Sequence, residues 1–330
     1  MRIAIVGATG AVGREMVQVL EKRGFPVRSL RLFASPRSRG VLIPFRGEMV
    51  AVEELKPGCF AGIDIALFSA GKRISLEWAA EVKKAGALMV DNSSAFREDP
   101  KVPLIIPEIN SRAFQSHEGI VSCPNCTTAI MLMALAPLHQ RVAIKRIVAS
   151  TYQAASGAGA VAMEELREET RAHLEGRPFE RTAMPFPYAF NLFTHNSPLC
   201  EGGHVDEEVK MVRETKKILG SPSIQVSATC VRVPVLRAHS ISLNVEFTSR
   251  LTSEEAYKIL EKSPGVSILE EKGRNRFPMP IDASGQDAIL CGRIREDSTQ
   301  PNTLNLWVVG DQLLKGAALN SIQIAELLIL

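Results

Sequence analysis

The residues with the clearest chemical potential surround Cys126, in the run Cys123-Pro124-Asn125-Cys126-Thr127-Thr128. The apolar stretch Thr127–Leu135 predicts a buried helix, which places Cys126 at a helix N-terminus. The positive end of a helix dipole favours the thiolate form of a cysteine and therefore its nucleophilic reactivity. Asn125 and Thr127 could donate hydrogen bonds to an oxyanion formed beside the sulfur. The alternative is a packed, unreactive cysteine, which is common in buried helices.

Glycines recur near the start of the chain, in the run Gly7-Ala8-Thr9-Gly10-Ala11-Val12-Gly13. The run follows the short apolar segment Arg2–Val6 and precedes a helical pattern that ends near Gly24. A strand, a tight turn and a helix in that order let backbone N–H groups and the helix N-terminus bind a pyrophosphate. The spacing G-x-x-G-x-x-G is weaker than G-x-G-x-x-G, so a plain tight turn is the alternative, but the flanking elements favour dinucleotide binding.

The end of the second apolar run, Leu30–Ala34, indicates which dinucleotide would bind. An NAD site places a carboxylate there, on the ribose hydroxyls, whereas this sequence reads Ser35-Pro36-Arg37-Ser38-Arg39. Guanidinium and hydroxyl groups suit a 2′-phosphate, so the turn predicts NADP, with Ser35, Arg37 and Ser38 as ligands. A solvated basic turn is the alternative reading.

Composition limits the classes of protein that these motifs can belong to. The chain has 330 residues, 45% of them hydrophobic, which predicts two domains with ample cores. Lys and Arg outnumber Asp and Glu by only 39 to 36, so we expect no nucleic-acid partner. The six scattered cysteines fit a reducing cytoplasm. The apolar start is too short for a signal peptide, and the sequence lacks the long apolar run of a membrane helix.

The elements that position the motifs follow from periodicity. Over roughly the first 120 residues, apolar runs alternate with helix-like or loop segments, including the helical piece Ser75–Ala85. The predicted strands are Arg2–Val6, Leu30–Ala34, Asp64–Ser69 and Ala87–Val90. This alternation predicts an α/β fold with a Rossmann-like, doubly wound parallel sheet in residues 1–125.

Beyond Cys126 the pattern indicates a mixed α+β domain, which we expect to span residues 126–309. Its predicted helices are Gly159–His173 and the charged Asp206–Leu219, stopped by Gly220, and its predicted strands are Ser223–Arg232, Ser240–Thr248 and Leu304–Val309. The Pro- and Phe-rich segment Arg177–Pro198 predicts a loop. A last helix, Leu313–Leu328, is expected to return to the first domain, so that residues 310–330 complete it.

Five motifs taken in order resemble the aspartate-semialdehyde dehydrogenase family. They are GATGAVG from Gly7, DNSSAFR from Asp91, PNCTT from Pro124, YQAASG from Tyr152, and GDQLLKGAA from Gly310, with Arg232 and His239 before the last. The resemblance covers nearly the whole chain and is most specific in PNCTT and YQAASG. It implies NADPH-dependent reductive dephosphorylation of β-aspartyl phosphate to aspartate semialdehyde, on the branch toward lysine, threonine and methionine. It also implies a homodimer whose second domain is both catalytic and dimerising.

The resemblance implies roles for individual residues. Cys126 would be the nucleophile that forms a thioacyl enzyme, with His239 as its acid/base and Gln153 orienting the substrate. Such chemistry requires a thiolate, a proton acceptor and a nearby nicotinamide. Arg232 would bind the substrate carboxylate through its guanidinium fork. Arg232 and His239 have opposite parity on a straight strand, so we expect a bend or bulge at Pro234 if both reach one pocket.

Further ligands are implied in the same way. The substrate amino group would contact Glu207, although the neighbouring Glu208 is an alternative, and phosphate would contact Lys210 and Arg97. Asn125 would lie against the substrate beside the nucleophile. The remaining cofactor contacts would be Ser156, Gly157 and Gln312. Without the resemblance, Glu207 and Lys210 would be read as a solvated face of a helix, three residues apart.

Competing interpretations use fewer of these residues. Cys123 and Cys126 form C-x-x-C, but Cys200 and His204 are a poor second half for zinc, so we expect no metal. A thioredoxin-like protein would be smaller. A cysteine-dependent hydrolase would not need a site for the 2′-phosphate of NADP. A Rossmann-type binding module without catalytic activity would not need the Cys, Gln, Arg and His residues named above. N-acetyl-glutamyl-phosphate reductase and glyceraldehyde-3-phosphate dehydrogenase share the chemistry with different flanking sequences.

The second thiol of the C-x-x-C run suggests a redox hypothesis. Oxidation of Cys126 to a sulfenic acid could be resolved by Cys123 as a reversible disulfide. Pro124 stiffens the loop between them, so the two sulfurs meet only if the backbone brings the cysteines within disulfide geometry.

Overall fold

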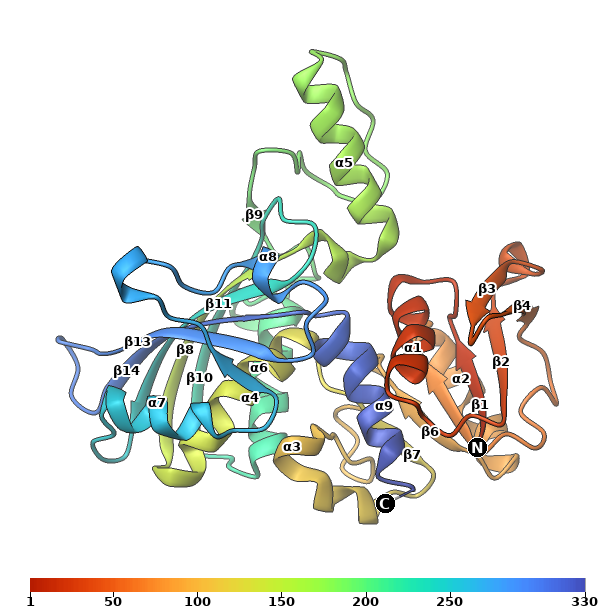
Figure 1. Cartoon of the computed structure of the whole chain (residues 1–330), viewed down its shortest axis with the longest axis horizontal. Helices are drawn as coiled ribbons and strands as arrows, with labels where there is room; N and C mark the ends of the chain where they lie inside the picture. Colours follow the sequence, from red (N-terminus) through yellow and green to blue (C-terminus); the bar gives the residue numbers. More distant parts are fainter. Residues whose placement is uncertain (330) are drawn as a thin grey trace. The chain divides into compact units, whose positions relative to one another are not determined.

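The computed structural model of the chain describes residues 1–329. It consists of two compact units of different architecture (Figure 1). Unit 1 comprises Met1–Asn125 and the chain from Ala317 onward, and unit 2 comprises Cys126–Gly316. The division after Gly316 falls later than the predicted boundary before residue 310. The reason is that Asp311 belongs to unit 2, where its carboxylate accepts from Arg237 Nε at 2.6 Å and from the Gly285 backbone N–H at 2.7 Å.

A seven-stranded sheet forms the core of unit 1, in the order β3-β4-β2-β1-β5-β6-β7. Neighbouring strands from β4 to β7 pair in parallel, and the edge strand β3 runs antiparallel to β4. The strands are β1 (Arg2–Val6), β2 (Ser29–Ala34), β3 (Leu42–Phe45), β4 (Glu48–Glu54), β5 (Ile65–Phe68), β6 (Leu88–Asp91) and β7 (Ile120–Ser122). All four strands predicted for this region are present. β5 is buried throughout, as unbroken apolar strands covered on both faces must be.

The glycine turn lies at the carboxyl end of β1. The chain continues to β2 on one side of β1 and later to β5 on the other, so this end is the topological switch point where such sheets bind ligands. Gly7 has φ +88°, and a Cβ on it would lie 2.4 Å from the Ser69 carbonyl oxygen. A Cβ on Gly13 would lie 2.2 Å from the Gly7 carbonyl oxygen. Only glycine therefore allows α1 (Ala11–Lys22) to start this close to the strand.

The C-terminal helix belongs to unit 1, as predicted. α9 (Leu319–Glu326) packs against α1, where Arg23 makes two 2.7 Å hydrogen bonds to the Glu326 carboxylate. Asn92 Nδ2 donates to Ser321 Oγ at 2.6 Å, which ties the helix to the segment after β6. The predicted helix Leu313–Leu328 is not α-helical from its start, because Leu314–Ala318 forms a π-helical turn. The other helices of unit 1 are α2 (Lys72–Lys84) and the short α3 (Pro107–Asn110).

Unit 2 is built on a second seven-stranded sheet, in the order β12-β13-β14-β11-β8-β10-β9. The strands are β8 (Ile144–Gln153), β9 (Phe193–Thr194), β10 (Gln225–Arg232), β11 (His239–Phe247), β12 (Val266–Ile268), β13 (Ile289–Glu296) and β14 (Thr303–Gly310). β10 is parallel to β8, and β11 is antiparallel to both β8 and β14. This mixed sheet with its helices confirms the predicted fold class of a doubly wound parallel sheet plus an α+β domain.

One helix in unit 2 is almost completely buried. α4 (Cys126–Arg141) contacts β8, β11, β13 and β14, and it lies beside α6 (Asp206–Leu219) and α7 (Ser253–Glu261). It is apolar around most of its circumference, which is the pattern of a core helix. The predicted helix ended at Leu135, six residues before the observed end at Arg141. α6 has the predicted bounds and ends at Gly220, which adopts the left-handed conformation.

The Pro- and Phe-rich loop is ordered by buried carboxylates of α5 (Ala160–Leu174), a helix that projects away from the unit 2 sheet in Figure 1. Glu165 accepts hydrogen bonds from the backbone N–H groups of residues 182, 183 and 184 at 2.5–2.7 Å. Glu169 accepts from those of residues 188 and 189 at 2.8 and 3.1 Å. Burial raises the pKa of Glu165, but these donors outweigh it and hold the pKa below its ordinary value. The loop is thus a packed wrap around α5.

Candidate active site

Three of the predicted site residues meet at one edge of the unit 2 sheet. Gln153 ends β8, Arg232 ends β10 and pairs with Gln153, and His239 begins the antiparallel β11. Because β11 runs opposite to β8 and β10, its first residue and their last residues share that edge. The expected irregularity between Arg232 and His239 is present: the two lie on different strands, and Ala238 before His239 has φ +73°.

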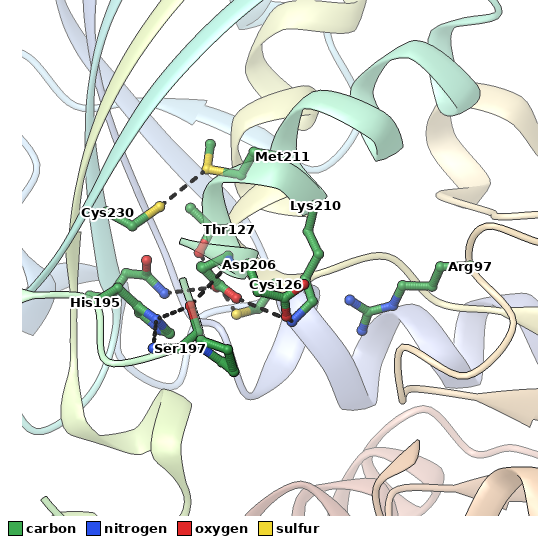
Figure 2. Close-up of polar contacts among 12 residues, drawn as sticks. Arg97, Cys126, Thr127, His195, Ser197, Asp206, Lys210, Met211 and Cys230 are labelled. Atoms are coloured by element: carbon green, nitrogen blue, oxygen red, sulfur yellow. Dashed lines mark hydrogen bonds and ion pairs between the residues drawn. The ribbon is translucent and has the colours of Figure 1, made fainter. Parts of the chain in front are cut away.

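Cys126 is the first residue of α4 and is half-buried. Its sulfur lies 3.6 Å from His239 Nε2 and 3.9 Å from Thr127 Oγ1. Figure 2 shows Cys126 and Thr127 at the start of the helix. The helix N-terminus and the ring nitrogen both favour the thiolate over the thiol. A Cβ on Gly316 would lie 2.8 Å from Cys126 Cβ, so the π-helical turn approaches the cysteine more closely than any larger residue would permit.

His239 is fully buried and fixed in one orientation. The Ala154 backbone N–H donates to His239 Nδ1 at 3.0 Å, so the ring proton resides on Nε2, the nitrogen that faces Cys126. Burial lowers the pKa of His239 well below its ordinary value, and the nearby Arg232 and His195 lower it further. The site therefore presents a neutral imidazole whose N–H points at the sulfur.

Gln153 connects the sheet edge to α6. Its Nε2 donates to Glu207 Oε1 at 3.1 Å, and its Oε1 accepts from Thr151 Oγ1 at 3.0 Å. Lys210 Nζ lies 3.8 Å from Glu207 Oε2 and 2.6 Å from Asp206 Oδ2, and the close Asp206 contact is drawn in Figure 2. Gln153, Glu207 and Lys210 therefore form one polar chain, with Glu207 buried inside it.

Glu208 faces a different set of partners. Its Oε2 accepts from the Val205 backbone N–H and its Oε1 from the Cys230 backbone N–H, both at 3.1 Å. It thereby caps the start of α6 and joins α6 to β10. Of the two adjacent glutamates, Glu207 is the one that contacts Gln153.

Arg232, His239 and Gly157 converge on one point. Arg232 is 5% exposed, and its Nη1 donates to the Ala154 carbonyl at 3.4 Å. A Cβ on Gly157 would lie 3.0 Å from both Arg232 Nη1 and the His239 ring. Next to it, Ser156 Oγ accepts from Gln312 Nε2, and Gln312 Oε1 accepts from the Ala238 backbone N–H at 2.9 Å. Ser156, Gly157 and Gln312 are thus part of the same cluster in unit 2.

In unit 1 the glycine turn opens onto a cavity of about 410 Å³. Of the predicted cofactor residues, Gly7, Thr9, Gly10 and Ser35 line it. Leu55, Ile74 and Trp78 form an apolar part of the wall. Thr9 Oγ1 lies 3.3 Å from Ser38 Oγ, which connects the glycine turn to the Ser35–Ser38 turn. Among the remaining predicted residues, Arg37 is exposed, Ala11 and Val12 start α1, and Gly13 packs against the Gly7 backbone.

Arg97 and Asn125 are buried residues of unit 1. Arg97 Nε donates to the Cys123 carbonyl at 2.9 Å and its Nη2 to the Asn92 carbonyl at 2.7 Å, so the guanidinium is held by backbone. Cys123 is fully buried, and its sulfur lies 3.3 Å from Ser321 Oγ. Burial raises the pKa of the Cys123 thiol to about 11. The disulfide with Cys126 stays a prediction, and the burial of Cys123 counts against it.

Sequence reasoning missed the segment after β9. His195 is buried beside Arg232 and Glu207, whose charges both act on it, and Ser197 contacts the start of α6. No local pattern could have identified these residues, since they lie in the Pro- and Phe-rich loop. Within residues 1–329, no group of three or more His, Cys, Asp or Glu side chains could hold a metal ion. None of the helices in that range has both the length and the apolar character required to cross a membrane.

Comparisons with known proteins agree with this architecture. A family model described as semialdehyde dehydrogenase, NAD binding domain, matches residues 2–117, and one described as semialdehyde dehydrogenase, dimerisation domain, matches residues 135–315. An aspartate-semialdehyde dehydrogenase of Synechocystis is 54% identical over 100% of this chain and 97% of the relative. One of Bacillus subtilis is 43% identical over 99% and 96%. A crystal structure of aspartate semialdehyde dehydrogenase II from Vibrio cholerae, complexed with ASA, superimposes with a TM-score of 0.97 at 41% identity, covering 99% of this chain and 98% of that one.

The environment of Cys126 predicts selective alkylation. With iodoacetamide near neutral pH, Cys126 should react about tenfold or more faster than Cys200, although Cys200 is more exposed, because only Cys126 has a helix N-terminus and an imidazole N–H to stabilise the thiolate. Cys123, Cys230 and Cys291 should not react, since burial raises their pKa to about 11, 12 and 12. Peptide mass spectrometry over time gives the rates. His239→Ala should slow Cys126 alone, and faster labelling of Cys200 in the wild type would contradict the assignment.

Proposed function

Since the chain belongs to the aspartate-semialdehyde dehydrogenase family, we propose that it reduces β-aspartyl phosphate to aspartate semialdehyde with NADPH, releasing phosphate, through a thioester on Cys126. The observation that carries the proposal is the 3.6 Å approach of the Cys126 sulfur to His239 Nε2, with Gln153 and Arg232 at the same sheet edge. The relative from Vibrio cholerae is described as complexed with ASA, which supports this substrate.

The cavity of unit 1 fits a dinucleotide phosphate. In the turn, the Gly7 and Ala8 N–H groups donate to the Phe33 carbonyl and the Gly10 N–H donates to the Gly7 carbonyl. The pyrophosphate would therefore be bound by the first N–H groups of α1, which lack intrahelical partners. Ser35, Arg37 and Ser38 would hold the 2′-phosphate of NADP, and Ser156, Gly157 and Gln312 would contact its nicotinamide half. When bound, NADPH supplies the hydride that reduces the acyl group.

The cysteine and histidine divide the covalent chemistry. The Cys126 sulfur attacks the acyl carbon, and the bond from that carbon to the phosphate oxygen breaks, with the electron pair leaving on phosphate. After reduction, the carbon–sulfur bond breaks and the sulfur leaves as thiolate. His239 would assist as a hydrogen-bond donor from Nε2, in place of the acid/base role that the resemblance implies, because its Nδ1 accepts from the Ala154 N–H and the ring proton lies on Nε2. Its Nε2–H stabilises first the thiolate and then the oxyanion beside it, without a buried imidazolium.

The remaining polar groups bind the substrate. Arg232 would take the α-carboxylate with its guanidinium, and Glu207 would take the α-amino group, a choice favoured over Glu208 by the contact with Gln153. Lys210 and Arg97 would bind the phosphate group, and Asn125 would lie against the acyl carbonyl. Gln153 orients the substrate beside Cys126.

The wider setting is also proposed. The product would lead toward lysine, threonine and methionine. The free cysteines support a reducing cytoplasm as the compartment. We propose a homodimer formed by unit 2, since the matching family model is a dimerisation domain. Apolar side chains exposed on α5 and the wrap around it support this assignment: Val161, Leu174, Phe186, Phe190 and Leu192.

The central test measures NADPH formation from aspartate semialdehyde, NADP and phosphate. Cys126→Ala should abolish turnover while NADP binding, followed by fluorescence or calorimetry, stays unchanged, because the cysteine lies outside the glycine turn. Substantial turnover by Cys126→Ala would refute the thioester route. Failure of the wild type to use aspartate semialdehyde, with another aldehyde accepted, would refute the substrate.

Cofactor preference tests the Ser35–Ser38 turn. Arg37→Glu should raise the KM for NADP about tenfold or more and leave the KM for NAD nearly unchanged, because only NADP carries the 2′-phosphate. Arg39→Glu, which removes the neighbouring guanidinium, is the matched control and should raise the KM for NADP less than Arg37→Glu does. Equal weakening of NADP and NAD by Arg37→Glu would show that the turn does not read the 2′-phosphate.

Two substitutions of His239 test whether its side chain acts as a hydrogen-bond donor. His239→Gln retains an N–H group, whereas His239→Ala removes it, so kcat should fall by roughly 10²- to 10⁴-fold in the alanine variant and clearly less in the glutamine variant. Steady-state rates and the circular dichroism spectra of both variants provide the comparison. Equal losses would indicate that protonation and deprotonation of the ring, and not donation from Nε2, limits the reaction.

The oligomeric state tests whether the exposed apolar side chains of α5 and the wrap form the dimer interface. Light scattering coupled to size-exclusion chromatography should give a dimer for the wild type and a shift toward monomer for Phe190→Ser, because an apolar interface loses area at that position. Leu76→Ser, an exposed apolar residue on α2 of unit 1, is the control. A monomeric wild type would remove the proposal.

A further inference from the structure

The short segment His195–Ser197 spans the gap between β10 and α6. It follows β9, whose residues pair with Val231 and Arg232 of β10. The His195 backbone N–H donates to the Cys230 carbonyl at 2.8 Å, which extends this pairing by one more hydrogen bond. The segment is therefore anchored to the strand that ends in Arg232.

Each of the two polar side chains after His195 contacts a different element of the site. Asn196 Oδ1 accepts from Arg232 Nε at 3.4 Å. Ser197 Oγ accepts from the Glu207 backbone N–H at 3.1 Å, in the first turn of α6, where helical N–H groups lack intrahelical partners. Arg232 and Glu207 come from separate elements, and this segment contacts both.

His195 keeps the segment in one conformation. Its Nδ1 accepts from the Ser197 backbone N–H at 3.2 Å and lies 3.1 Å from Ser197 Oγ, contacts that Figure 2 draws. Burial, and after it the charge of Arg232, lowers the pKa of His195 to about 4. A neutral ring adds no third charge between the Arg232 guanidinium and the Glu207 carboxylate, so both can sit nearby.

We propose that His195, Asn196 and Ser197 are positioning residues that orient Arg232 and Glu207 and thereby set specificity for an α-amino acid aldehyde. This rests on the proposed function. Asn196 holds the guanidinium at Nε and the Ala154 carbonyl holds it at Nη1, so the plane in which the guanidinium would meet a carboxylate is set. Ser197 holds the backbone of Glu207, which determines where that carboxylate meets an amino group. The two halves of the segment thus serve different groups of one substrate.

The experiment compares aspartate semialdehyde with succinate semialdehyde, which has the carboxylate but no amino group. Asn196→Ala should raise the KM for both aldehydes about 2- to 10-fold, the worth of one ordinary hydrogen bond, with little change in kcat. Ser197→Ala should raise the KM for aspartate semialdehyde only, so the difference between the KM values for the two aldehydes should become smaller. Ser197→Thr keeps the hydroxyl group and should restore most of that difference. The KM values for NADP and phosphate should not change.

Asn191→Ala is the matched control, because Asn191 lies in the same loop but its Nδ2 donates to the Pro187 carbonyl. Unchanged KM values in both Asn196→Ala and Ser197→Ala would overturn the proposal. So would parallel changes in kcat and in the KM for every substrate, which would indicate a structural role alone. A wild type that does not prefer aspartate semialdehyde over succinate semialdehyde would refute the proposed substrate, and the positioning role with it. A wild type that shows this preference, with unaffected variants, would refute the positioning role only.

Discussion

The elements of unit 2 hold the Cys126 sulfur 3.6 Å from the neutral ring of His239, and the proposed chemistry depends on this contact. Two constraints meet there. The thiol must begin a buried helix, so that the helix dipole stabilises the anion, and the ring must have its Nδ1 occupied, so that the proton faces the sulfur. Gly316 completes the arrangement, because a side chain there would collide with Cys126. On the proposed function, the reactivity of Cys126 would come from backbone geometry as much as from the two side chains.

The charges around that pair are tolerated because each one has a partner. Glu207 accepts from Gln153 and lies near Lys210. Glu208 accepts from two backbone N–H groups, which join α6 to β10, and lies 3.6 Å from His204 Nδ1. Buried carboxylates of this kind cost free energy unless hydrogen-bonded, so the polar chain is a requirement of folding as well as of binding. The same principle applies to the wrap around α5, where Glu165 and its backbone donors lie beside an apolar cluster that includes Leu166, Met184 and Tyr188.

The sequence pattern predicted the helices and strands that are determined by residues close together in the chain. The strand, glycine turn and first helix were predicted correctly, as was α6, because periodicity and a terminal glycine define them. The hairpin β3–β4 was missed, since β3 has only four residues and the apolar residues 49–52 of β4 form a short run in which only Val52 is buried. The wrap was unreadable because carboxylates on α5 order it. Cys126 and His239 are 113 residues apart, so only the family resemblance could bring them together, and His195 had no signal at all.

The most direct test of the account is the acyl enzyme itself. With aspartate semialdehyde and NADP but no phosphate, the protein should release a burst of about one NADPH per site and then stall, with an acyl adduct that peptide mass spectrometry maps to Cys126. Adding phosphate should discharge the adduct and restart turnover. A burst without an adduct on Cys126, or steady turnover that needs no phosphate and leaves Cys126 unmodified, would contradict the central claim that this sulfur carries the acyl group.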